Sequence, residues 1–140
     1  MEARSGRALA VGGRMPIQLD HIIVPARDKR ESAEFLARIL GLDVGAQVGP
    51  FLPVRTGNGV TLDFMDSDDF RWHHCAFLVP DEEFDGIFSR IKETGARYYA
   101  NPDGSGEGEI NTRDGGRGVY FTDPGGHAME VLTVPYGGWS

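Results

Sequence analysis

Hydrophobic and polar residues alternate most clearly between Gly118 and Thr133, a stretch that reads GVYFTDPGGHAMEVLT. Two alternating runs flank Asp-Pro-Gly-Gly, a combination that favours a tight turn. The pattern therefore predicts two short strands joined by that turn. Glu130 shares a face with Leu132, where a half-buried side chain is expected. Because a buried carboxylate is costly unless it is paired, hydrogen-bonded or bound to a metal, Glu130 requires a partner.

The rest of the chain shows the same kind of patterning from Ile17 onward. Apolar residues at helical spacing predict two amphipathic helices, one from Asp28 that ends before Gly41 and one from Asp81 that ends before Gly95. Asp81 is expected to cap the second helix. Alternation and turn signals predict the remaining strands at residues 17–24, 42–45, 51–55, 60–65, 72–79 and 97–100.

The two halves of the chain repeat one pattern. HIIVPARDKRESAEFLARILGLDV and HCAFLVPDEEFDGIFSRIKETGARY both run from a histidine through an apolar strand, Val-Pro, acidic residues, a helix and a glycine to a new strand. Each half therefore predicts a βαβββ unit. The first strands carry His21 and His74, and the last strands carry Asp63 and Glu130. If the two units pair around a pseudo-twofold axis, these four side chains converge on one cleft.

Composition limits the class of protein. The chain has 140 residues, 40% of them hydrophobic and 25% charged, which is typical of one soluble domain, expected here to cover residues 16–140. Residues 1–15 are expected to form a disordered extension, or to precede a true start at Met15. The formal net charge of -7 argues against nucleic acid or an anionic membrane as the partner. The single cysteine, Cys75, and the absence of a long apolar run predict a cytoplasmic protein.

His21, His74 and Glu130 are candidate metal ligands. Two histidines and one carboxylate leave coordination positions open and are typical of non-haem Fe(II), while Mn, Ni or Zn remain alternatives. Asp63 could be a fourth ligand or an acid/base beside the metal. A lone histidine on a strand is more often a hydrogen-bonded core residue, so the interpretation depends on the repeat, which places all four residues on equivalent strands.

Four segments, LDHIIVPARD, GVTLDF, HHCAFLVPD and GRGVYFTDPGGHAMEVLTVPYG, resemble the vicinal oxygen chelate superfamily. This superfamily includes glyoxalase I, fosfomycin-resistance proteins, bleomycin-binding proteins and extradiol dioxygenases. The resemblance covers residues 17–138 and implies an α+β fold in which two βαβββ repeats form a cupped mixed sheet. It also places the metal ligands at His21, His74 and Glu130, and it places the further carboxylate of glyoxalase I at Asp63.

A narrower resemblance is to the chartreusin-biosynthesis type of dioxygenase, carried by VPARDK, LDF, DEEFDGIF, the GEIN and DGGRGVYF segments and the terminal PYG. It implies an Fe(II) enzyme that uses O2 on a polycyclic aromatic polyketide, and a homodimer in which two chains supply the ligands. Tyr120 lies ten residues before Glu130, the separation at which extradiol dioxygenases carry an active-site tyrosine.

Other candidates have weaker support. Arg113, in the long polar loop, is a candidate for substrate contact. Phe51 and Trp72 are candidates for an aromatic pocket, although core or dimer packing is an equal alternative. His73 and His127 are expected to be structural.

We therefore expect an Fe(II)-dependent dioxygenase that acts on an aromatic substrate with two neighbouring oxygens, by oxidative ring cleavage or rearrangement, with Asp63 as acid/base and Tyr120 beside the reacting oxygen. A glyoxalase-type isomerase or lyase with Asp63 as a true ligand of Ni or Zn is the first alternative. A metal-free protein that binds an aromatic antibiotic is the second.

Overall fold

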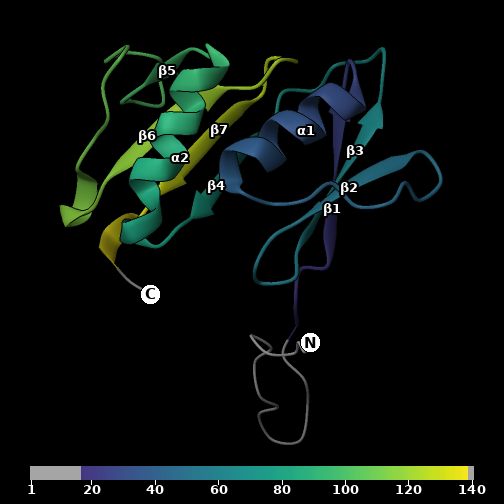
Figure 1. The fold of residues 1–140 in the computed structure, drawn as a ribbon, viewed down its shortest axis with the longest axis horizontal. Helices are drawn as coiled ribbons and strands as arrows, with labels where there is room; N and C mark the ends of the chain where they lie inside the picture. Colours follow the sequence, from purple (N-terminus) through teal and green to yellow (C-terminus); the bar gives the residue numbers. More distant parts are fainter. Residues whose placement is uncertain (1–16, 139–140) are drawn as a thin grey trace, which may run out of the picture.

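The structure is a computed structural model that describes residues 17–138, so the expectation for residues 1–15 lies outside the described residues. It contains two halves that follow each other along the chain, each with one helix and one sheet (Figure 1). The predicted α+β class is confirmed. The elements are β1 (His21–Ala26), α1 (Lys29–Leu40), β2 (Phe51–Arg55), β3 (Thr61–Asp66), β4 (His74–Leu78), α2 (Asp81–Thr94), β5 (Tyr98–Tyr99), η1 (Arg113–Gly115), β6 (Gly118–Thr122), β7 (Ala128–Leu132) and η2 (Tyr136–Gly138).

The first sheet has the order β1-β3-β2, with β1 parallel and β2 antiparallel to β3. The strand predicted at residues 42–45 is reduced to an isolated bridge between Val44 and Val54. Gly45 donates its N–H to the carbonyl of Pro53, but Pro53 has no N–H to continue the ladder. The first repeat thus keeps three strands where the pattern predicts four.

The second sheet has the order β4-β7-β6-β5 and is parallel only between β4 and β7. The predicted hairpin of β6 and β7 is confirmed. Its turn is held by Asp123, whose Oδ1 accepts hydrogen bonds of 2.9 Å from the backbone N–H groups of Gly125, Gly126 and His127. The Asp-Pro-Gly-Gly sequence therefore encodes the turn through both its glycines and its carboxylate.

Both helices end as predicted, at Gly41 and Gly95, each in the left-handed region with φ of 71° and 77°. Asp28 caps α1 by accepting hydrogen bonds from two backbone N–H groups. The prediction that Asp81 caps α2 is wrong, because Pro80 occupies the cap position and Asp81 is already helical. The Asp81 carboxylate instead pairs with Arg117 at 3.1 Å. Within residues 17–138, neither helix is long and apolar enough to cross a membrane.

One hydrophobic core joins the helices to the inner faces of both sheets. Its largest members alternate along the strands or recur at helical spacing. They include Val24, Leu36, Ile39, Leu52, Phe64, Phe84, Ile87, Ile91, Phe121, Met129 and Val131. The opposite face of each sheet is therefore left for other uses, and the candidate site lies there.

His127 connects the two halves. It is fully buried; its Nε2–H donates to the Pro25 carbonyl of β1 at 2.6 Å, while Nδ1 accepts from the backbone N–H of His73 at 3.0 Å. The ring of Phe70 stacks on it, with 4.8 Å between centroids. Both ring nitrogens are thus committed to backbone groups, which agrees with the structural role predicted for His127.

Candidate functional site

The two repeats place a histidine and a carboxylate in the same register. In the first sheet Ile23 of β1 pairs with Asp63 of β3, and in the second sheet Ala76 of β4 pairs with Glu130 of β7. His21 and His74 each lie two residues before these positions, on the same face of their strands. The structure therefore places the predicted ligands at equivalent positions, one histidine and one carboxylate in each sheet.

The pair in the second half is in direct contact. His74 Nε2 lies 3.1 Å from Glu130 Oε1, and the Glu130 side chain is only 2% exposed. Glu130 is more deeply buried than the alternation predicted, because the chain returns after β7 and places a residue over its carboxylate. Two residues, His74 and a tyrosine, are the partners that its burial requires.

The hydrogen bonds of His74 fix the orientation of its ring and leave its Nε2 facing Glu130. Its Nδ1 lies 3.1 Å from the carbonyl oxygen of Ala128, which can only accept, so Nδ1 carries a hydrogen. In a neutral imidazole, Nε2 would then direct a lone pair at the Glu130 carboxylate. The contact is favourable only if a proton or a metal ion lies between the two groups. An imidazole held by a backbone carbonyl through its second nitrogen is the usual arrangement of a metal-bound histidine.

Aromatic side chains form a row on the same face of the second sheet. Tyr120 of β6 lies directly opposite Glu130 in the strand register, and its ring stacks on His74 with 5.8 Å between centroids. The ring of Trp72 also stacks on His74, at 6.3 Å, and Tyr99 stacks on Tyr120 at 5.9 Å. Trp72 is 65% exposed, so it is not core packing within the chain. This row could bind a planar ring.

Tyr136 belongs to this site, although it was not predicted from the sequence. Its hydroxyl lies 3.2 Å from each oxygen of Glu130 and 2.8 Å from the hydroxyl of Tyr120. With Glu130 ionised, Tyr136 donates to the carboxylate and accepts from Tyr120. The terminal PYG segment contains this residue and was the available signal, but nothing in the spacing showed that the chain folds back onto Glu130.

The environment of Tyr120 keeps it protonated. Burial raises the pKa of Tyr120 above its ordinary value, and its hydrogen bond to Tyr136 and the charge of Glu130 act in the same direction. The Arg113 guanidinium acts in the opposite direction and is a smaller effect. Tyr120 is therefore a neutral hydrogen-bond donor at physiological pH.

Arg113 is held near Glu130 by the loop in which it lies. Its guanidinium Nη2 donates to Asn101 Oδ1 at 2.5 Å, and Nη1 lies 3.5 Å from the carbonyl of Ala100. Arg113 also borders a small cavity of about 10 Å³ that Glu130 and Tyr136 line. It is thus next to the candidate site, where it was predicted to contact substrate.

In the first half, the histidine is exposed to solvent. His21 Nδ1 bonds to the neighbouring Asp20 at 2.9 Å, and both side chains are largely exposed. This hydrogen bond raises the pKa of His21, with partial burial acting against it and the charges of Asp20 and Asp63 adding to it. Phe51 pairs with Met65 of β3, two residues from Asp63 on the same face. Phe51 and Asp63 therefore belong to the first sheet, away from the row of rings on the second.

His21 does not complete the site within one chain. Among residues 17–138, no three His, Cys, Asp or Glu side chains lie close enough to hold a metal ion. The chain thus presents two half-sites, with His74 and Glu130 in one and His21 and Asp63 in the other.

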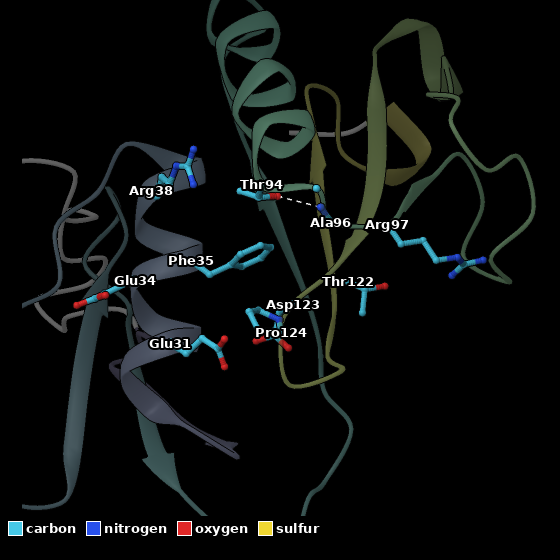
Figure 2. A pocket seen from close by; sticks show the side chains of 11 residues that line it. Glu31, Glu34, Phe35, Arg38, Thr94, Ala96, Arg97, Thr122, Asp123 and Pro124 are labelled. Carbon is cyan, nitrogen blue, oxygen red and sulfur yellow. Dashed lines mark hydrogen bonds between the residues drawn. The ribbon is translucent and has the colours of Figure 1, made fainter.

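A larger cavity than the one beside Glu130 lies elsewhere in the described part of the chain. It has a volume of about 670 Å³ between α1 and the ends of β5 and β6, and Figure 2 shows Phe35 and Glu31 reaching from α1 toward Asp123 and Pro124. None of the predicted site residues lines it. Size alone therefore does not identify the site, which is defined by its chemistry on the opposite faces of the sheets.

Residues 18–131 match the model of the Glyoxalase/Bleomycin resistance protein/Dioxygenase superfamily, and the chain belongs to this family. Among solved structures it is similar to oxidase ChaP-H2, with 56% identity, a TM-score of 0.85 and coverage of 88% of this chain and 98% of the other. Oxidase ChaP-H1 is similar at 53% identity and a TM-score of 0.84, covering 88% and 100%.

A more distant relative is glutathione transferase FosA of Serratia marcescens, 23% identical over 81% of this chain and 78% of the relative. The recognition of the superfamily from sequence is confirmed. The neighbours that are named as oxidases support an enzyme with oxidative chemistry, and the superfamily makes a divalent metal plausible.

Proposed function

We propose that this protein is an Fe(II)-dependent dioxygenase that uses O2 to cleave or rearrange an aromatic substrate with two neighbouring oxygens, of the polycyclic polyketide class. The observation that carries the proposal is the contact between His74 and Glu130, since an imidazole nitrogen that faces a buried carboxylate supplies two of the donors that a divalent metal prefers. The similarity to oxidases ChaP-H1 and ChaP-H2 supports oxidative chemistry.

The third ligand is proposed to be His21 of the partner subunit in a homodimer. β1 and β4 are edge strands of their sheets, and each exposes apolar residues near its histidine: Ile22 at 40%, Ile23 at 42% and Leu78 at 61%. An exposed apolar edge is a template for pairing with another strand. Pairing of β1 from one subunit with β4 from the other joins the two half-sites and closes the cupped sheet that the resemblance implies.

Each remaining site residue has a proposed task. Iron bound by the two histidines and Glu130 supplies a Lewis acid that lowers the pKa of a chelated phenol and a centre that can activate oxygen. Asp63 accepts the proton that the substrate releases. Trp72 and Phe51 contact the faces of the aromatic rings, and Arg113 donates hydrogen bonds to a peripheral oxygen of the substrate. Tyr120, kept neutral by its burial, donates a hydrogen bond to the developing negative charge.

Reconstitution of the protein with Fe(II) under argon, followed by addition of oxygenated buffer and a panel of catechols and polycyclic quinols, tests this function. We expect oxygen uptake that depends on both iron and substrate, recorded with an oxygen electrode. His74→Ala is the matched negative control, because it removes one nitrogen ligand and leaves the core face of β4 unchanged. No uptake with any substrate would contradict the proposal. Turnover with Ni or Zn under argon would instead favour a glyoxalase-type isomerase or lyase.

Analytical ultracentrifugation tests the homodimer. We expect Leu78→Asp, at the exposed edge of β4, to convert the dimer into a monomer, because an unpaired charge in an apolar interface is costly to bury. Val48→Asp is the matched control, since Val48 is 66% exposed but lies outside β1 and β4. A monomeric native protein, or a dimer unaffected by Leu78→Asp, would contradict the shared site.

A further inference from the structure

The hydroxyl of Tyr136 occupies a central position in front of the Glu130 carboxylate. It lies at the same distance, 3.2 Å, from Oε1 and Oε2. A residue that merely orients a metal-bound carboxylate bonds to the oxygen that the metal leaves free. A donor shared equally by both oxygens instead lies where a metal ion chelated by both oxygens would lie, and so competes with that ion for their lone pairs.

The same hydroxyl also engages Tyr120. Because Tyr136 donates its only proton to Glu130, it accepts the proton of Tyr120 at 2.8 Å. In this conformation, Tyr120 has no proton left to donate to a substrate or to oxygen. Displacement of Tyr136 therefore releases two groups of the site together, the carboxylate and the Tyr120 hydroxyl.

The chain is anchored before Tyr136, where Thr133 exchanges hydrogen bonds of 2.9 and 3.0 Å with Arg117, and is held more loosely at Tyr136 itself. Its side chain is 54% exposed, although the hydroxyl reaches inward. Gly137 donates its N–H to Asp114 Oδ2 at 3.3 Å, a long hydrogen bond to an exposed residue. These features suit a segment that closes over the site and opens again.

The closure depends on close approach between the C-terminal segment, here residues 133–138, and the loop before β6. A Cβ at Gly116 would lie 2.7 Å from Thr133 Oγ1 and 2.8 Å from Val134 Cγ2, which is shorter than such contacts allow. The cavity of about 10 Å³ between Glu130, Arg113 and Tyr136 shows how little space remains behind the ring. Glycine at position 116 therefore permits the segment to lie this close.

We propose that Tyr136 guards the metal site: its hydroxyl takes the place of the metal ion at Glu130, and the C-terminal segment swings away when the ion binds. This inference rests on the metal centre of the proposed function. In this proposal Tyr136 opposes metal binding, whereas a residue that orients a metal ligand would favour it. Removing an orienting partner of a metal ligand weakens metal binding by about 10–100-fold, whereas removing a competitor strengthens it.

Calorimetric titration of the metal-free protein with Mn(II) alone, an ion that is stable in air, tests the role of Tyr136. We expect Tyr136→Phe, which keeps the ring, to bind Mn(II) about tenfold more tightly than the native protein, as fits the loss of one hydrogen bond to a charged group. Tyr98→Phe is the matched control and should be unchanged, since the Tyr98 ring packs edge-on against Phe88 on the core side of β5. Equal or weaker binding by Tyr136→Phe would overturn the proposal.

Gly116→Ala perturbs the same closure without touching a hydroxyl. We expect it to speed Mn(II) association about threefold or more in stopped-flow tryptophan fluorescence, because Trp72 stacks on His74 and reports on the site. An unchanged association rate would overturn the role of the C-terminal segment. A native protein that binds no Mn(II) would overturn the proposed metal centre itself, whereas native binding with no gain in either variant would overturn only the guarding role of Tyr136.

Discussion

The two halves of the molecule share one backbone plan and differ in what their site residues do. In both, a histidine near the start of the first strand lies two residues before the position that pairs with a carboxylate. In the second half that carboxylate, Glu130, is buried, lies 3.1 Å from His74 Nε2 and accepts a hydrogen bond from Tyr136. In the first half, Asp63 is half-buried and His21 pairs with its neighbour Asp20 instead.

The two carboxylates differ because their side chains have different lengths and because only Glu130 is covered by a returning segment of the chain. Glutamate has one more methylene than aspartate, which allows Glu130 to reach the histidine of the adjacent strand at 3.1 Å. The second half also has a fourth strand and a returning C-terminal segment that exclude water from Glu130. Duplication thus places equivalent residues in equivalent positions, and only the local surroundings bring one histidine and carboxylate into direct contact.

The largest expected effect comes from Glu130→Gln, which keeps the shape of the side chain and removes its charge. We expect Mn(II) affinity to fall by more than about 100-fold, a larger loss than that for an outer-shell partner. The measurement is calorimetric titration with Mn(II), with circular dichroism to confirm folding. Retention of native affinity would show that the anchored carboxylate of the second half is not a metal ligand.

The next largest effect concerns the connection between the halves. His127→Ala removes two buried hydrogen bonds and leaves a cavity beneath Phe70, so we expect the free energy of unfolding in urea to fall by about 2–4 kcal/mol. His73→Ala is the matched control. The hydrogen bond to His127 comes from the backbone of His73, which the substitution keeps. The exposed hydrogen bond of its ring to Arg71 and its edge-on contact with the His127 ring are lost, and together they should cost below about 1 kcal/mol. Equal losses in the two variants would contradict the linking role.

The smallest effect is expected from Asp63→Asn, the counterpart of the first substitution. Because Asp63 is proposed as an acid/base and not as a ligand, Mn(II) affinity should change by less than about threefold. The oxygen uptake of the iron-loaded protein should fall more steeply than the metal affinity. A loss of affinity comparable to that of Glu130→Gln would make the two halves equivalent and would favour a four-ligand centre of the glyoxalase type.

Much of the fold was predictable because its signals are local. The Asp-Pro-Gly-Gly turn, the glycines after both helices and the apolar stripes act within a few residues of themselves, and each was confirmed. The failures came from residues farther along the chain. Pro53 limited the ladder at residues 42–45, and Arg117, 36 residues from Asp81, took the carboxylate that was expected to cap α2.

Most residues of the candidate site could be predicted from the sequence, but the contacts between them could not. The repeat and the family resemblance identified His74, Glu130 and Tyr120, but Tyr136 depends on how the chain returns after β7. Such a return is set by long-range contacts, including the close approach at Gly116, and leaves no periodic signal in the sequence.

The amino-acid sequence by itself determined the two-repeat plan, the strand and helix periodicities and the residue types that are able to bind a metal, because each follows from spacing along the chain. Only the tertiary structure decided that Glu130 is buried against His74 and capped by Tyr136, and that His21 lies in the other sheet. The physical reason is that burial and hydrogen-bond geometry arise between segments far apart in sequence, where the side chains meet only once both sheets have formed.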